Sequence, residues 1–235
     1  MALTGMFVAA AIKELRAVVL PFMAALVRHY TMVAVSQQCG PFASMGRQNK
    51  LQGMDPLVLV DALVAIMGHE EKELCKPGHL ALMIILDTAT IILSSKERAC
   101  KLPFLEYLAE RMCSLCYERA WYAKLGGCIS LKFLFERMTL KWVFAHQYLF
   151  LRALLFVMMD LTGEVSSGAV DMAKSNLEKM LTLCGTPIIP DGTNKELIDA
   201  QTKSLHEVIQ ELVRQVTSPN TCVREQVCIS TKLIG

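Results

Sequence analysis

Apolar residues recur along this chain at the spacing of one face of an α-helix. No stretch of strand length alternates apolar and polar positions between turn signals. Three rows are especially clear: Leu205, Val208, Ile209, Leu212, Val213 and Val216; Val170, Ala173, Leu177, Met180, Leu181 and Cys184; and Leu105, Leu108, Met112, Leu115 and Cys116. Each row predicts a helix with one buried face. The pattern therefore predicts an all-α protein of about ten helices.

Helix pairs repeat along the chain. The second helix of a pair is expected to open near Pro77, Ala120, Gly168 and Ser218, so successive openings lie 43, 48 and 50 residues apart. This is close to the ~40–47 residues of HEAT and armadillo units, in which each pair stacks on the next. We therefore expect a HEAT/armadillo-like solenoid of antiparallel helix pairs. It would form a single segment over residues 1–235, with pairs near 1–40, 54–98, 99–138, 139–185 and 194–235.

Capping residues and prolines mark several helix ends. Asp55–Pro56 and Ser218–Pro219 each place a capping side chain before a proline that suits the first helical position. Gly185, followed by Pro187 and Pro190, is expected to end the helix that closes at Cys184.

Three other positions are unusual for helices. Pro21 and Pro103 lie within apolar helical runs, where an interior proline costs ~3 kcal/mol in an isolated helix. Each proline either bends a helix or starts a new one, and the sequence leaves both readings open. Gly126–Gly127 also falls in a helical run, and we expect it to allow close approach of a neighbouring helix.

The composition raises the question of a membrane. Hydrophobic residues make up 53% of the 235 residues, and the most apolar runs are Ala17–Val27, Leu80–Leu93 and Trp142–Met159. Charged or ionisable residues bracket or interrupt all three: Arg16, Arg28, Asp87, His146 and Arg152. A charged residue at mid-helix costs ~2.5–3.5 kcal/mol on insertion scales. We therefore expect buried helices of a soluble protein, with a membrane protein as an alternative.

Charge and cysteine content bear on whether the protein binds nucleic acid or is secreted. The 24 Lys and Arg residues against 22 Asp and Glu give a net charge of +2, and the charges are dispersed. A nucleic-acid footprint would need basic residues on one face, so none is expected. The apolar stretch Phe7–Ile12 has no preceding basic residue and is followed by Lys13 and Glu14, unlike a secretory signal. The nine cysteines are therefore expected to be reduced thiols of an intracellular protein.

Signatures of enzyme chemistry are absent from the sequence, which contains no GxGxxG, GxxxxGK[ST], GxSxG or HExxH pattern. We therefore expect no enzyme, no catalytic residue, no cofactor and no metal ligand. Cys113 and Cys116 form a lone CxxC, which lacks the second pair of a structural zinc site. His69, Cys75 and His79 could cluster across a turn, although a polar helix end is favoured. A small helical metal-binding protein is kept as an alternative.

Long segments of the chain resemble one known family. The segments are Trp121–Gly127, Leu154–Ser166, Ala11–Phe22, Ser94–Cys100 and Val216–Asn220. They are similar to the transformation/transcription domain-associated family, the pseudokinase scaffolds among the phosphatidylinositol-3-kinase-related kinases. Two stretches depart from it: Phe42–Gly53 is shorter than in the family, and Cys184–Asn194 diverges in sequence.

The resemblance implies an internal piece of a helical-repeat region, away from the kinase-like domain. It implies a non-catalytic scaffold of a nuclear transcription coactivator that docks activators and tethers histone acetyltransferase complex subunits. By physics alone, the same repeats would suit a HEAT-repeat adaptor outside transcription, such as a transport or kinase-scaffold arm. Uncovered apolar end faces would make the isolated chain self-associate.

Overall fold

A computed structural model of the chain describes residues 2–39, 55–159, 168–190 and 194–234. Every regular element within these residues is an α-helix or a short 3-10 helix, which confirms the expected all-α fold for the described part of the chain. The chain divides into two compact units, Met1–Leu115 and Cys116–Gly235, and each is described by itself.

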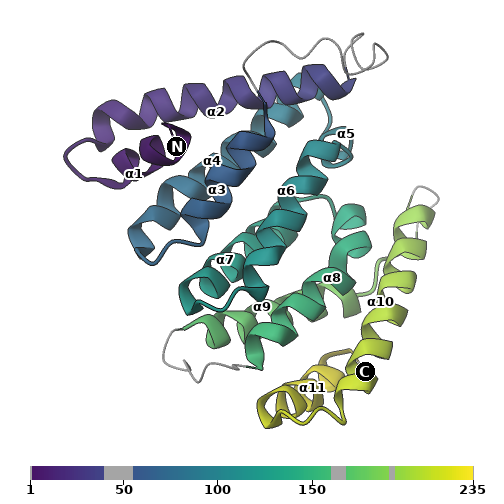
Figure 1. Cartoon of the computed structure of the whole chain (residues 1–235). Helices are drawn as coiled ribbons and strands as arrows, with labels where there is room; N and C mark the ends of the chain where they lie inside the picture. The colour runs from purple at the N-terminus through teal and green to yellow at the C-terminus, as the bar shows by residue number, and fades with distance from the viewer. Residues whose placement is uncertain (1, 40–54, 160–167, 191–193, 235) are drawn as a thin grey trace. The chain divides into compact units, whose positions relative to one another are not determined.

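The first unit is built from six α-helices among its described residues. They are α1 (Ala2–Ala11), α2 (Arg16–Cys39), α3 (Leu57–Met67), α4 (Cys75–Leu93), α5 (Lys96–Cys100) and α6 (Pro103–Ser114), with the 3-10 turn η2 (Lys72–Leu74) before α4 (Figure 1). Helix α2 packs along α4, while α1 contacts both α2 and α3. Its core includes the fully buried side chains of Phe7, Met23, Leu63 and Ile85.

The second unit contains five α-helices among its described residues. They are α7 (Trp121–Arg137), α8 (Leu140–Met158), α9 (Ala169–Gly185), α10 (Lys195–Gln215) and α11 (Thr221–Ile234), and the 3-10 turn η3 (Leu115–Tyr117) precedes them (Figure 1). Each helix contacts the next helix but one: α7 with α9, α8 with α10, and α9 with α11. Contacts of this order are those of stacked helix pairs.

Helices α4, α7, α9 and α11 begin at Cys75, Trp121, Ala169 and Thr221, within three residues of the expected openings. The boundary between the two units falls inside the expected pair over residues 99–138. The pairing of α6 with α7, and the continuity of one solenoid over residues 1–235, therefore stay predictions.

The helix caps confirm one expectation and correct another. The Asp55 carboxylate accepts a hydrogen bond from the Leu57 amide at 3.0 Å, as expected for the start of α3. At α11 the expected Ser218–Pro219 cap is wrong, because Asn220 caps the helix by accepting from the Val223 amide at 3.1 Å. Asn caps as well as Ser does, and it stands next to Thr221, where the helix begins.

The two prolines within apolar runs behave differently. Pro21 lies inside α2, which continues through it to Cys39. Pro103 is the first residue of α6, after Leu102 in an extended conformation, so it starts a helix. The reading that a proline starts a helix therefore holds at Pro103, whereas Pro21 lies within one, and a bend there stays a prediction. At α9, the expected stop is confirmed, because Gly185 is its last residue.

The apolar rows are covered to different extents. All members of the rows beginning at Leu105 and Val170 are buried. In the row along α10, Val208 and Leu212 are buried, but Ile209, Val213 and Val216 are exposed. Helices α8, α9 and α11 thus cover only one side of a row that the sequence predicts to face the core as a whole.

The adjacent glycines of α7 lie where a neighbouring helix approaches. Gly126 and Gly127 are both buried, and α9 packs along α7. The side-chain amide of Asn176 on α9 donates to the carbonyl oxygen of Cys128 at 2.7 Å. A side chain of one helix therefore reaches the main chain of the other next to the glycines, as close approach requires.

Candidate functional site

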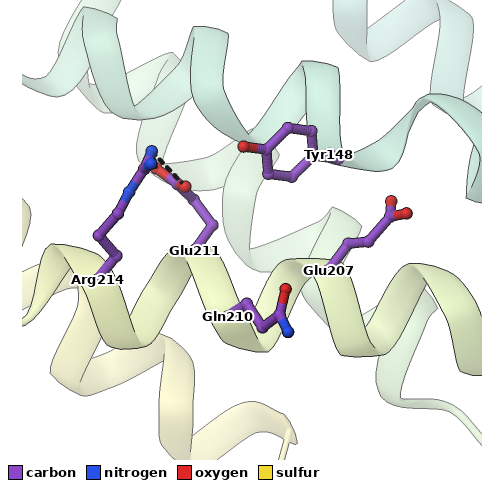
Figure 2. Close-up of a pocket in the computed structure, with 5 residues that line it drawn as sticks. All are labelled: Tyr148, Glu207, Gln210, Glu211 and Arg214. Carbon is purple, nitrogen blue, oxygen red and sulfur yellow. Dashed lines mark hydrogen bonds and ion pairs between the residues drawn. The ribbon is translucent and has the colours of Figure 1, made fainter.

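A groove of about 400 Å³ lies between α8 and α10 in the second unit (Figure 2). Helix α8 contributes Tyr148, and α10 contributes Glu207, Gln210, Glu211 and Arg214. The four α10 residues share one face because they are three or four positions apart. Figure 2 shows the Tyr148 hydroxyl pointing toward the Glu211–Arg214 pair, with Glu207 at the other end of the groove.

Glu211 is the electrostatic centre of the groove. Its side chain is only 4% exposed. Its carboxylate oxygens lie 2.8 and 2.6 Å from Nη2 of Arg214, and Oε1 also accepts from Nε2 of Gln215 at 2.9 Å. This pairing raises the pKa of the Arg214 guanidinium, chiefly through the hydrogen bond to Glu211 and its charge. The buried carboxylate is thus satisfied within its own helix, as a buried charge must be.

The groove lining offers several hydrogen-bonding groups. Its side chains are a phenol, two carboxylates, an amide and a guanidinium, without a serine or cysteine nucleophile beside a base. Nearby, the Nε2 atoms of His206 and Gln210 lie 2.8 Å apart, an exposed contact within α10. These contacts hold the polar side chains of α10 in place. The groove can therefore form hydrogen bonds with a polar segment of another protein.

A buried polar seam joins α10 to α8 on the same face of α10, nearer the N-terminal end of that helix than the groove. Oγ of Ser204 donates to Oε1 of Gln147 at 2.6 Å, and Nε2 of Gln147 donates to the Met180 carbonyl oxygen at 2.9 Å. These contacts join α10, α8 and α9, and both side chains are buried. Sequence reasoning missed this seam, although a glutamine within the apolar run of α8 is a signal that could have pointed to it.

The cysteine next to the seam is held protonated. Burial raises the pKa of the Cys184 thiol above its ordinary value of 9.0, and hydrogen bonds to Ser204 and Gln147 oppose this shift in part. Burial likewise raises the pKa of Cys75. The environment of Cys184 therefore does not supply the thiolate that a nucleophilic or metal-binding cysteine needs.

Four of the residues considered as metal ligands are buried or hydrogen-bonded to other groups. Cys113 and Cys116 are buried, at the end of α6 and in η3. Nδ1 of His69 accepts from the Glu71 amide, and the Cys75 thiol donates to the Met67 carbonyl oxygen. Within the described ranges, no group of three or more His, Cys, Asp or Glu side chains could hold a metal ion.

The polar cluster before α4 has the form expected of a solvated helix end. Nζ of Lys76 lies 2.7 Å from Oε2 of Glu73, and both side chains are exposed. The hydrogen bond from Lys76, together with its charge, lowers the pKa of the Glu73 carboxyl.

Three described stretches are long and apolar enough to cross a membrane by length and composition: Arg16–Cys39, Lys72–Leu93 and Leu140–Met158. Each carries an exposed charged residue, Arg28, Asp87 or Arg152 respectively. Buried helices of a helical-repeat protein can have the same length and composition. The class of this protein is therefore decided by comparing the whole chain with known proteins.

Residues 1–234 match the family described as the Tra1 HEAT repeat ring region. The chain belongs to this family. Among its relatives, the human protein named transformation/transcription domain-associated protein is 56% identical over 248 residues, which cover all of the chain. The Drosophila melanogaster protein named transcription-associated protein 1 is 55% identical over 234 residues, which again cover all of it.

A more distant relative comes from yeast. The Saccharomyces cerevisiae protein named SAGA complex/NuA4 acetyltransferase complex subunit TRA1 is 25% identical over 231 residues, or 94% of the chain. The chain spans 6% of the length of each of these three relatives. The family resemblance and the HEAT-repeat architecture expected from the sequence are thereby confirmed. The matched family is a HEAT-repeat region and carries no catalytic domain.

Proposed function

We propose that this chain is a non-catalytic scaffold segment of a nuclear transcription coactivator. In this role it helps to bring histone acetyltransferase complex subunits to transcription activators. The observation that carries the proposal is the match of residues 1–234 to the Tra1 HEAT repeat ring region. The yeast relative, named as a subunit of two acetyltransferase complexes, supports the assignment to that setting.

Exposed apolar rows support a contact function. On α2, Val18 is 79% exposed and Phe22 is 65% exposed. On α10, Val213 is 62% exposed, between Ile209 on the same helix and Val216 directly after its end. Together, these residues are called the exposed rows below. Apolar rows on rigid helices are typical of surfaces that bind other proteins, and we assign them to protein subunits of the same complex.

The groove between α8 and α10 supports the same role. Its Glu211 carboxylate is paired with Arg214 and Gln215 of the same helix, and its lining holds no activated nucleophile. Stacked helices and a polar groove present a rigid surface with polar groups in fixed positions. A scaffold needs such a surface to bind a partner.

A membrane-spanning protein is a second candidate because three helices have the necessary length and composition. Extraction of cell membranes with alkaline sodium carbonate distinguishes the scaffold from the membrane-spanning protein. Our proposal predicts that the expressed chain is released into the supernatant. Retention in the pellet with an integral membrane marker would favour the second candidate.

Capture from nuclear extract tests the scaffold role itself. A tagged chain is used to capture proteins, and the bound fraction is assayed for acetyl transfer from acetyl-CoA to histones. We expect several-fold more activity than with a tagged HEAT solenoid of similar length from a transport protein. Equal activity in the two fractions would overturn the proposal and favour an adaptor outside transcription.

A further inference from the structure

Two Ser/Thr-Pro pairs occur in the sequence, Thr186–Pro187 and Ser218–Pro219. Each follows a long helix, and neither has a basic residue at the third position after the hydroxyl residue, so local sequence distinguishes them little. The structure places the two hydroxyl groups in very different surroundings.

Thr186 presents its side chain on the surface directly after α9. The residue is exposed, and its backbone is extended, with φ −70° and ψ 116°. Proline disfavours the helical conformation in the residue before it, so Pro187 itself maintains this extended conformation. Residues 187–190 have no regular secondary structure, and Pro187, Ile189 and Pro190 are exposed. A protein kinase can therefore bind residues 186–190 as an extended strand, and only the last turn of α9 precedes the hydroxyl residue.

Ser218 is enclosed. It is only 7% exposed, and its carbonyl oxygen accepts a hydrogen bond from Nη1 of Arg224 at 2.6 Å. Its amide donates to the Gln215 carbonyl oxygen, and its hydroxyl oxygen lies 3.4 Å from the Asn220 amide. Phosphorylation of this hydroxyl would require the turn between α10 and α11 to open first.

We propose that Thr186 is a phosphorylation site for a proline-directed protein kinase. Pro187 has no backbone N–H, so the substrate suits kinases that do not need a hydrogen bond from that position. In the reaction, Oγ1 of Thr186 bonds to the γ-phosphorus of ATP while the bond from that phosphorus to ADP breaks. The hydroxyl proton passes to the kinase base, and ADP leaves.

A phosphate at Thr186 would act on the connection between α9 and α10. Oγ1 of Thr186 donates to the Thr182 carbonyl oxygen at 2.6 Å, a bond that phosphorylation removes. Nε2 of Gln201 on α10 donates to the carbonyl oxygens of Cys184 and Thr186, at 2.8 and 2.7 Å. A dianion at the C-terminal end of a helix meets the negative end of its dipole. Loosening of the last turn of α9 would move the carbonyl oxygens of Cys184 and Thr186 away from Gln201 and expose Cys184.

The test treats the full chain with a cyclin-dependent kinase and Mg·ATP, and follows both sites by phosphopeptide mass spectrometry. Synthetic peptides around Thr186 and Ser218 give the reference rate of each unfolded sequence. For each site, the phosphorylation rate in the folded chain is divided by the rate in the matching peptide. We expect this ratio to be at least tenfold higher for Thr186 than for Ser218. Thr186→Ala should remove most incorporation, whereas Ser218→Ala should leave it unchanged.

If the rate at Thr186 falls as far below the rate of its peptide as the rate at Ser218 does, the assignment is overturned. The second part is read from Cys184. Alkylation of Cys184 by iodoacetamide is expected to be several-fold faster in the phosphorylated chain than in the Thr186→Ala chain treated in the same way. An unchanged alkylation rate would contradict the proposed effect on α9 and α10.

Discussion

Two buried amide side chains link helices of the second unit through main-chain carbonyl groups. Gln147 joins α8 to α9 and receives Ser204 of α10, while Asn176 joins α9 to α7. Apolar contacts alone allow helices to slide along one another, whereas a buried hydrogen bond is satisfied in only one register. These residues therefore contribute specificity to the stack of helices as well as stability.

Replacing Gln147 by alanine is expected to lower the free energy of unfolding by about 2–3 kcal/mol, since a cavity forms and the buried Ser204 hydroxyl loses its acceptor. Urea unfolding followed by circular dichroism measures this change. Gln210→Ala, on the exposed face of α10, is the control and should change stability by less than about 0.5 kcal/mol. Similar losses in the two variants would show that the seam has no special role.

The raised pKa of the Cys184 thiol leads us to expect a loss of stability at high pH. Because burial raises its pKa in the folded chain, the unfolded thiol ionises first, near its ordinary value of 9.0. The stabilising contribution is complete below that pH and is lost as the pH rises through the folded pKa. The urea midpoint of the native chain should thus fall more steeply above pH 9 than that of Cys184→Ala. Cys228→Ala, at an exposed thiol, should follow the native chain, and parallel curves for all three would contradict the prediction.

Helices α2 and α6 show how one residue type has opposite effects at different positions of an element. Pro21 removes a main-chain hydrogen bond inside α2, whereas Pro103 occupies the first position of α6, where no such bond would form. Both prolines are exposed, so their replacement removes little packing.

Pro21→Ala is therefore expected to stabilise the chain by about 1 kcal/mol or more, through the restored hydrogen bond and the better helix propensity. Pro103→Ala should be neutral or slightly destabilising, because the unfolded chain gains freedom. Thermal unfolding of the two variants under the same conditions measures the difference. The reverse order of melting temperatures would indicate that Pro21 provides a bend that the first unit needs.

The row along α10 gives a second prediction for an element. Val208→Glu places a carboxylate in the core and should cost about 3 kcal/mol or more, enough to reduce folding yield. Val213→Glu, five residues further on the same helix, changes an exposed side chain and should alter stability by less than about 0.5 kcal/mol. Chemical denaturation of both variants checks this. Comparable destabilisation would mean that Val213 is covered in solution.

Element type and order could be predicted from the sequence because helical periodicity is local. The buried rows beginning at Leu105 and Val170 follow from spacing alone, and the end of α9 at Gly185 follows from the glycine and the prolines after it. Partial burial of the α10 row could not be predicted, since it depends on which helices lie alongside. The polar seam was missed for the same reason: Gln147 bonds to residues 33 and 57 positions away.

For the molecule as a whole, the high apolar content is divided between buried cores and surfaces that are left uncovered. Side chains from α1 to α11 fill the cores of the two units, yet the exposed rows on α2 and α10 remain in contact with water. Each large apolar side chain that leaves water contributes on the order of 1.5–3 kcal/mol, so covering these rows would stabilise an assembly. A scaffold that holds other subunits needs such surfaces, and an enzyme with an enclosed site does not.

Cross-linking mass spectrometry of the tagged chain in nuclear extract tests the scaffold account most directly. The account predicts cross-links between acetyltransferase complex subunits and residues of α2 and α10. Phe22→Glu with Val213→Glu should reduce these cross-links several-fold, while Ser36→Glu with Thr202→Glu, which adds the same charge at other exposed positions of the same helices, should leave them unchanged. An absence of acetyltransferase subunits, or equal cross-linking by both double variants, would contradict the account.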